Sequence, residues 1–283
     1  MVNIFAGLEK FGVNPESASL FEDKEAEKEK QKQEAAASAP PEVKEEELLF
    51  ERTYECPICD EEFKVKTVKN GKAKSLGVDI DLRAKYEGID MVKYDVLACP
   101  HCGFAILSRY LKTVTPTQRK LVREKISGDF KGLHHDGPIY TYEQAMERYQ
   151  LTLANAVVKG AKASEKAYIC LKSGWLVRGM AENLELTDPN YEELSKKYAV
   201  LEGEYIKNAM EGFVVARQKE AYPMCGMDEY TVDYLIAALA IECKSYDIAS
   251  KLISTILAST TTPPRIKEKA RDLKEIVIEN KNA

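Results

Sequence analysis

Four of the seven cysteines are arranged in two Cys-x-x-Cys pairs, Cys56–Cys59 and Cys99–Cys102. Two residues between cysteines let one tight turn aim both sulfur atoms at a single ion, and two such turns complete a tetrahedral site. A proline follows the first cysteine of each pair, and Gly103 follows the last cysteine, where glycine tolerates a positive φ angle. The pattern therefore predicts one structural zinc ion bound by Cys56, Cys59, Cys99 and Cys102.

A shell filled by four sulfur atoms leaves no position for water or substrate, which argues against hydrolysis at the metal. His101 lies between two ligands, and we expect it to face solvent. Iron is the alternative metal, because the same four-sulfur cage occurs in rubredoxin-type redox proteins. The sequence shows neither a phosphate-cradling glycine loop nor a convincing nucleophile with its base, so the expected protein is not an enzyme.

Short strands are expected beside both cysteine pairs, because apolar and polar residues alternate there. The alternating apolar positions are Phe63, Val65 and Thr67, then Tyr94, Val96 and Ala98, then Phe104 and Ile106. The 39-residue spacer, residues 60–98, is longer than the ~15–20 residues of a minimal ribbon. We therefore predict a zinc-ribbon domain over residues 50–112 with an insertion around residues 78–94. The insertion either covers the sheet or forms a binding loop displayed by the zinc core.

Helical periodicity begins near residue 138 and predicts about six helices in antiparallel pairs over residues 138–281. Asp188 before a proline, and Asp228, are expected to cap the third and fourth of these helices. Residues 228–264 resemble one tetratricopeptide unit, two helices joined by a tight turn, although the long third helix breaks a strict period. The alternative is an irregular helical bundle. Residues 113–137 connect the two parts and carry His134 and His135, interpreted as a polar loop rather than a site.

Two N-terminal segments differ from the rest of the chain. Residues 1–20 hold a short apolar patch, either a packed helix or a docking peptide. Residues 21–48 contain ten acidic residues and five lysines, which predicts a charged, disordered linker.

The overall composition constrains the protein class. The net charge is -5, and no apolar run approaches the ~18 residues of a membrane span, so no membrane association is expected. The N-terminal residues lack a secretory-signal pattern, and an odd number of cysteines in Cys-x-x-Cys pairs favours metal binding over a disulfide framework. The expected location is the cytoplasm.

Lysines gather on and after the first predicted ribbon strand, at Lys64, Lys66, Lys69, Lys72 and Lys74. Such a face can contact nucleic-acid phosphates, although it lacks the interleaved aromatic residues of a single-strand platform. It also serves as protection of a strand edge. Nucleic-acid contact is therefore an alternative function rather than the main one.

The stretch from Tyr54 to Tyr110 resembles the bacterial family catalogued as domain of unknown function 2225. Between the cysteine pairs, the resemblance rests on the runs Asp79-Ile80-Asp81-Leu82-Arg83, Tyr86-Glu87-Gly88-Ile89 and Tyr94-Asp95. It extends over most of residues 50–280 and implies a bacterial cytoplasmic protein, without an established activity.

Together these features predict an α+β, mostly α fold: a small β zinc ribbon followed by an all-α tetratricopeptide-like array. The main functional hypothesis is a non-enzymatic adaptor or scaffold whose helical array binds a protein or peptide. Arg, Tyr and Trp side chains on its concave face are expected to anchor that partner. The alternatives are a zinc-ribbon regulator that contacts nucleic acid and a rubredoxin-like iron protein.

Overall fold

The computed structural model describes residues 43–282, which form one compact unit. The predicted segment 1–20 and residues 21–42 of the predicted linker lie outside the described residues. The end of that linker is folded: Glu45–Leu48 forms a 3-10 helix, η2, and Leu48 is buried.

The β structure consists of three separate two-stranded antiparallel hairpins. The strands are β1 (Leu49–Glu55) with β2 (Glu62–Val68), β3 (Ser75–Val78) with β4 (Ala84–Tyr86), and β5 (Val96–Ala98) with β6 (Ala105–Leu107). The strands predicted around Phe63 and Ile106 are thus confirmed; β2 alternates between buried and exposed residues at its start, whereas all three residues of β6 are buried. Tyr94 instead ends a 3-10 helix, η3 (Met91–Tyr94), because Asp90 accepts a hydrogen bond from Val92 N and caps this turn.

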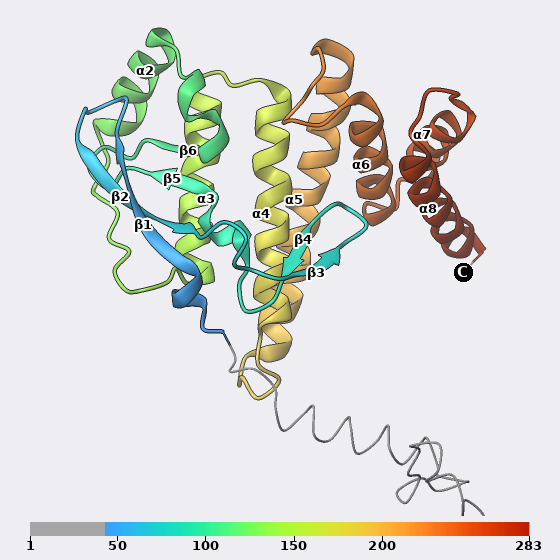
Figure 1. Cartoon of the computed structure of the whole chain (residues 1–283), viewed down its shortest axis with the longest axis horizontal. Helices are drawn as coiled ribbons and strands as arrows, with labels where there is room; N and C mark the ends of the chain where they lie inside the picture. The colour runs from blue at the N-terminus through green and yellow to red at the C-terminus, as the bar shows by residue number, and fades with distance from the viewer. Residues whose placement is uncertain (1–42, 283) are drawn as a thin grey trace, which may run out of the picture. The chain divides into compact units, whose positions relative to one another are not determined.

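The helices that follow the hairpins lie side by side in chain order (Figure 1). They are α2 (Pro116–Val122), α3 (Tyr142–Val158), α4 (Ala163–Glu182), α5 (Tyr191–Lys219), α6 (Glu229–Glu242), α7 (Tyr246–Ala258) and α8 (Pro264–Asn282). Helices α3 to α8 are the six predicted ones, so a small β region followed by a helical array is confirmed. Within residues 43–282, no helix combines the length and apolar character required to cross a membrane.

Local capping explains where the helices begin. Thr141 and Gln144 form a reciprocal capping box at the start of α3, and Asp228 accepts from Thr231 N at 2.8 Å, as predicted for α6. The predicted cap at Asp188 is wrong: its carboxylate accepts from Asn190 N at 2.7 Å in a turn, and α5 starts at Tyr191.

The β5–β6 hairpin joins two hydrophobic cores, because its two faces are both buried. Val96, Ala98 and Leu107 belong to the main core, which the helices α3 to α8 build. Leu97 and Ile106 point the other way, into the core that surrounds the four cysteines. This alternation follows from the period of two along a strand. The cysteine region and the helical array are therefore connected through one hairpin; the boundaries predicted for separate domains stay a prediction.

Candidate metal centre

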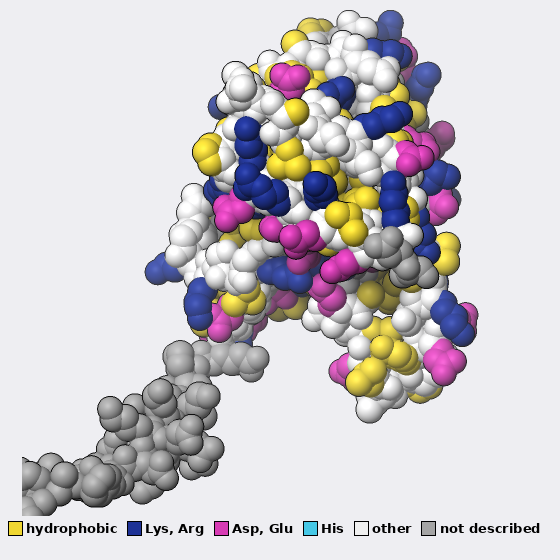
Figure 2. Space-filling model, turned by 90° about the vertical axis from the view of Figure 1, so that its right-hand side faces the viewer, with side chains coloured by type: hydrophobic (Ala, Val, Ile, Leu, Met, Phe, Trp, Pro, Cys, Tyr) yellow, Lys and Arg dark blue, Asp and Glu magenta, His cyan; other side chains and the backbone are white. Residues whose placement is uncertain are grey.

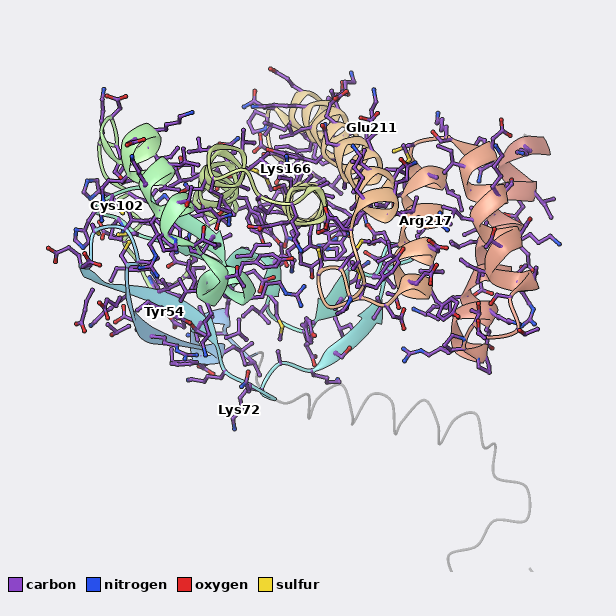
Figure 3. All side chains as sticks on the ribbon, turned by 90° about the horizontal axis from the view of Figure 1, so that it is seen from above. Tyr54, Lys72, Cys102, Lys166, Glu211 and Arg217 are labelled. Atoms are coloured by element: carbon purple, nitrogen blue, oxygen red, sulfur yellow. The ribbon has the colours of Figure 1, made fainter. Side chains whose placement is uncertain are left out.

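Each cysteine pair occupies the tip of a hairpin. The turn between β1 and β2 carries Cys56 and Cys59, and the turn between β5 and β6 carries Cys99 and Cys102, which is labelled in Figure 3. An equivalent backbone hydrogen bond closes each turn: Cys56 N donates to Glu61 O at 3.0 Å, and Cys99 N donates to Phe104 O at 2.8 Å. The two tips thus repeat one local structure.

The residue after each pair adopts a positive φ angle. Gly103 has φ 72°, as the sequence predicts, and Asp60 has φ 61° at the equivalent position after Cys59. A non-glycine residue in this region is uncommon, but aspartate is among the residues that tolerate it. The sequence pattern missed Asp60, because only the glycine carries an obvious signal.

The four sulfur atoms converge at one point. All four Sγ atoms lie within 4.8 Å of one another, with Cys56 and Cys102 at 3.5 Å and Cys59 and Cys99 at 3.7 Å. A disulfide requires about 2.05 Å, and all four cysteines are unbridged. A tetrahedral site with metal–sulfur bonds of about 2.3 Å has sulfur–sulfur edges of about 3.8 Å. The observed spacing fits such a site.

The surroundings of the sulfur atoms suit a closed structural site. Cys56, Cys99 and Cys102 are buried, Cys59 is partly exposed, and the core beside them includes Phe104 and Val122. Hydrogen bonds from the neighbouring Cys102 and Cys56 thiols lower the pKa of the Cys99 thiol to about 4. The same thiol contacts, together with burial, raise the pKa of the Cys102 thiol. The cluster thus favours a thiolate at Cys99, and the thiolate is the form that binds a metal.

Two polar side chains that the sequence analysis did not identify support the tips from outside. Asn155 of α3 is fully buried, and its Nδ2 donates to Gly103 O at 2.9 Å. Arg123 donates to Ile58 O in the other tip. In addition, Ile58 N lies 3.5 Å from Cys56 Sγ, in position to donate to the sulfur. Because Asn155 and Arg123 lie far from the cysteines in sequence, no local pattern could have identified them.

The predicted lysine group is not a continuous basic patch. Lys64 pairs with Glu51 at 3.3 Å, Lys74 pairs with Glu87 at 3.2 Å, and Lys69 donates to a backbone oxygen. Figure 2 shows a different side of the molecule, the right-hand side of Figure 1 where α7 and α8 lie, and there too basic and acidic side chains are interspersed. His101 is exposed, as expected.

The insertion packs against both the helices and the β1–β2 hairpin: Ile89 and Tyr94 share a small hydrophobic core with Leu49 of β1, and Asp81 reaches α4. Asp81 is fully buried; its carboxylate accepts from Trp175 Nε1 at 2.7 Å and pairs with Arg178 of α4 at 2.9 Å. Trp175 is therefore buried and is not available as a partner anchor. Arg178 also pairs with Glu202 and Glu242, at 2.6 and 2.9 Å.

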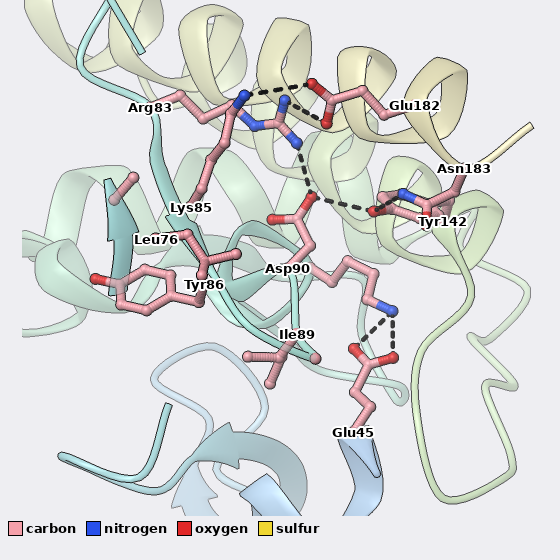
Figure 4. Close-up of a pocket in the computed structure, with 13 residues that line it drawn as sticks. Glu45, Leu76, Arg83, Lys85, Tyr86, Ile89, Asp90, Tyr142, Glu182 and Asn183 are labelled. Atoms are coloured by element: carbon pink, nitrogen blue, oxygen red, sulfur yellow. Dashed lines mark hydrogen bonds and ion pairs between the residues drawn. The ribbon is translucent and has the colours of Figure 1, made fainter. Parts of the chain in front are cut away.

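A pocket of about 430 Å³ lies beside this insertion (Figure 4). Its charged side chains already pair with one another, as Lys93 does with Glu45 at 2.7 Å and Arg83 does with Glu182 at 2.9 Å. Tyr142 also donates to Asp90 at 3.3 Å. The pocket therefore offers no unpaired charge that would define a ligand.

Comparison with known proteins gives one match. A family model described as "Uncharacterized protein conserved in bacteria (DUF2225)" matches residues 49–277. No curated protein and no solved structure matches the chain.

Proposed function

The chain belongs to the DUF2225 family, and from this premise and the four-cysteine centre we propose that it is a zinc-binding, non-enzymatic interaction protein. The single observation that carries the metal proposal is the convergence of four sulfur atoms from two hairpin tips to within 4.8 Å. Bound zinc would join the tips through Cys56, Cys59, Cys99 and Cys102 and stabilise the local fold.

Metal analysis of the purified protein tests this proposal. We expect one zinc per chain and no colour, whereas a red protein with one iron would support the rubredoxin-like alternative. The variant Cys59→Ser should lose most of the bound metal, because it removes one of four ligands. Cys243→Ser is the matched control: this cysteine is partly buried in the helical array and should not affect metal content. Metal-free wild-type protein would refute the proposal.

The proposed interaction function rests on the helical array and its exposed apolar side chains. Val200 on α5 and Ile278 on α8 are 68 % and 50 % exposed, although both are large hydrophobic residues. Stacked helices offer extended surfaces for protein or peptide partners. The proposed location is the cytoplasm, where reduced cysteines bind metal rather than forming disulfides.

Affinity capture from the native cells tests the interaction. The wild-type protein should recover a partner that a Val200→Asp, Ile278→Asp double variant recovers less well, because charge on these positions opposes apolar contact. Lys120→Asp, an exposed change on α2, is the control. Zinc content is measured on each sample, so loss of folding is separated from loss of binding. Equal recovery by all three proteins would contradict an interface at these helices.

A further inference from the structure

A small pocket next to the four-cysteine centre contains two cations, Lys66 and Arg148, neither of which forms an ion pair with a carboxylate of residues 43–282. It has a volume of about 230 Å³ and lies where the β1–β2 hairpin, Ala98–Pro100, the loop 133–136 and α3 meet. The charged residues that line it are three cations, Lys64, Lys66 and Arg148, and two carboxylates, Glu51 and Asp136. This site places Lys64 and Lys66, two of the five lysines that the sequence singled out, beside the loop with His134 and His135.

Arg148 is a buried guanidinium whose charge is not balanced. It is 3 % exposed, and its Nη2 donates to Val96 O at 3.2 Å. Its Nε has no hydrogen-bond partner, and among residues 43–282 no carboxylate forms an ion pair with it. A buried charge without an acidic partner is costly, so an anionic group bound beside Arg148 would stabilise it.

Lys66 approaches the same place from the β ribbon. Its Nζ lies 4.4 Å from the centre of the Tyr140 ring, and Arg148 Cζ lies 4.3 Å from the same centre. Burial and the adjacent Arg148 guanidinium lower the pKa of the Lys66 ammonium. Two cations therefore converge on one aromatic ring and repel each other.

Glu51 and Asp136 act on Lys66 without forming an ion pair with it and oppose the lowering of its pKa, whereas Arg148 has only the Tyr140 side chain as a favourable electrostatic neighbour. Lys64 and Glu51 pair with each other at 3.3 Å, and His135 Nε2 contacts Glu147 at 2.8 Å. Asp136 lies on the exposed rim and, within the described part of the chain, forms no ion pair. The pocket thus keeps an excess of positive charge inside a protein whose net charge is -5.

We propose that this pocket binds a phosphate group, with Arg148 and Lys66 as its positive ligands. A phosphate monoester carries about -1.5 to -2 charges near neutral pH, which balances two cations, whereas a carboxylate balances one. The planar guanidinium suits phosphate oxygens, and lysine supplies a point charge. The volume is below the ~300–1,000 Å³ of sites for drug-sized ligands, so it suits the phosphate group and few further atoms.

Titration of the metal-loaded full chain with inorganic phosphate tests the site. We expect saturable binding by calorimetry and an unfolding temperature that rises with phosphate concentration. Arg148→Met and Lys66→Met should each weaken binding at least tenfold and abolish the thermal shift. The control is Lys74→Met, because Lys74 is an exposed lysine of the same region that pairs with Glu87.

O-phosphoserine, titrated in parallel, identifies the source of the phosphate. Tighter binding of O-phosphoserine assigns the pocket to a phosphorylated ligand, and tighter binding of inorganic phosphate assigns it to the free ion. Wild-type affinity for phosphate in Lys66→Met would overturn the proposal, even if Arg148→Met failed to fold. Absence of binding to the wild-type protein would do the same. Neither result bears on the proposed zinc site, because metal content is measured separately.

Discussion

At the scale of single residues, the two hairpin tips depend on backbone angles that most side chains avoid. We predict that Gly103→Ala is strongly destabilising. A Cβ atom there would lie 2.6 Å from Phe130 Cδ2, and the φ angle of +72° is unfavourable for alanine. The angle alone costs about 1–3 kcal/mol, and the overlap adds to it. Urea unfolding of the metal-loaded protein measures the loss.

Gly71→Ala is a matched control for this prediction. Gly71 has φ +70°, but a Cβ atom there would meet nothing within 4 Å. The control therefore has the unfavourable angle without the overlap, and should lose about 1–3 kcal/mol of stability. If both variants lost equal stability, the contact with Phe130 would not matter for the tip.

Glu242 gives a pH dependence with a definite sign. Burial, reinforced by the nearby Asp81 carboxylate, raises the pKa of Glu242 from 4.5 to about 7. The folded state therefore holds this proton more tightly than the unfolded state, so deprotonation disfavours folding. The stability that protonated Glu242 contributes to the folded state is therefore lost as the pH rises from about 4.5 to about 7. Glu242→Gln stays neutral and should escape this loss.

The measurement is the free energy of unfolding of both proteins at several pH values from 4.5 to 8. Between pH 4.5 and 8, the free energy of unfolding of Glu242→Gln should rise relative to that of the wild-type protein by roughly 1–3 kcal/mol. Effects of pH on the cysteines cancel in the difference, because both proteins contain them. Glu192→Gln, at a carboxylate 89 % exposed, is the control and should follow the wild-type curve. Parallel curves for Glu242→Gln and wild type would contradict the raised pKa.

At the scale of elements, local patterns identified the structure that local forces determine. The alternation near Phe63 and the cap at Asp228 identified β2 and α6, because strand pleating and helix capping act over a few residues. The cysteine spacing likewise identified all four residues that meet. The spacing predicts the two similar turns, whereas their meeting is a tertiary contact that Asn155, Arg123 and the shared core support.

The insertion could not be placed from the sequence, because its contacts are far apart along the chain. Asp81 meets Trp175 and Arg178, almost a hundred residues away, and the pattern around Asp79 and Arg83 indicates only a polar loop. The same reason explains why Arg148 was not identified. A buried cation on a helix looks like a surface residue until its neighbours are known.

The insertion should be held on α4 mainly through Asp81. Asp81→Ala leaves the Trp175 N–H and part of the Arg178 charge unpaired, and breaking a buried pair costs about 3–5 kcal/mol. Trp175 is the only tryptophan, so its fluorescence should report the change directly. The measurement is urea unfolding followed by this fluorescence.

Glu87→Ala provides the control for this element. Glu87 also belongs to the insertion, but it is 58 % exposed and pairs only with Lys74 among the described residues. Exposed pairs contribute about 0–1 kcal/mol. Equal effects of the two substitutions would show that the buried contact with α4 does not hold the insertion.

At the scale of the whole molecule, the β5–β6 hairpin couples the metal centre to the helices. Leu97 and Ile106 face the cysteines, while Val96 and Leu107 face the helical core. Loss of the sulfur cluster would therefore loosen one face of a hairpin whose other face packs on α3. When the metal is lost, the two hydrophobic cores therefore cannot lose stability independently of each other unless this hairpin separates from one of them.

We therefore predict that removing the metal with a chelator destabilises the helical array as well as the hairpins. A loss on the order of 5 kcal/mol would lower the unfolding temperature by roughly 10–20 °C in a domain of this size. Circular dichroism at 222 nm reports the helices, and Trp175 fluorescence reports α4 and the insertion. Both signals should shift together, since residues 43–282 form one compact unit. Cys243→Ser should respond as wild type, whereas Cys59→Ser should unfold at the chelated temperature without chelator. An unchanged helical transition after metal removal would show that β5–β6 transmits no stability between the two cores.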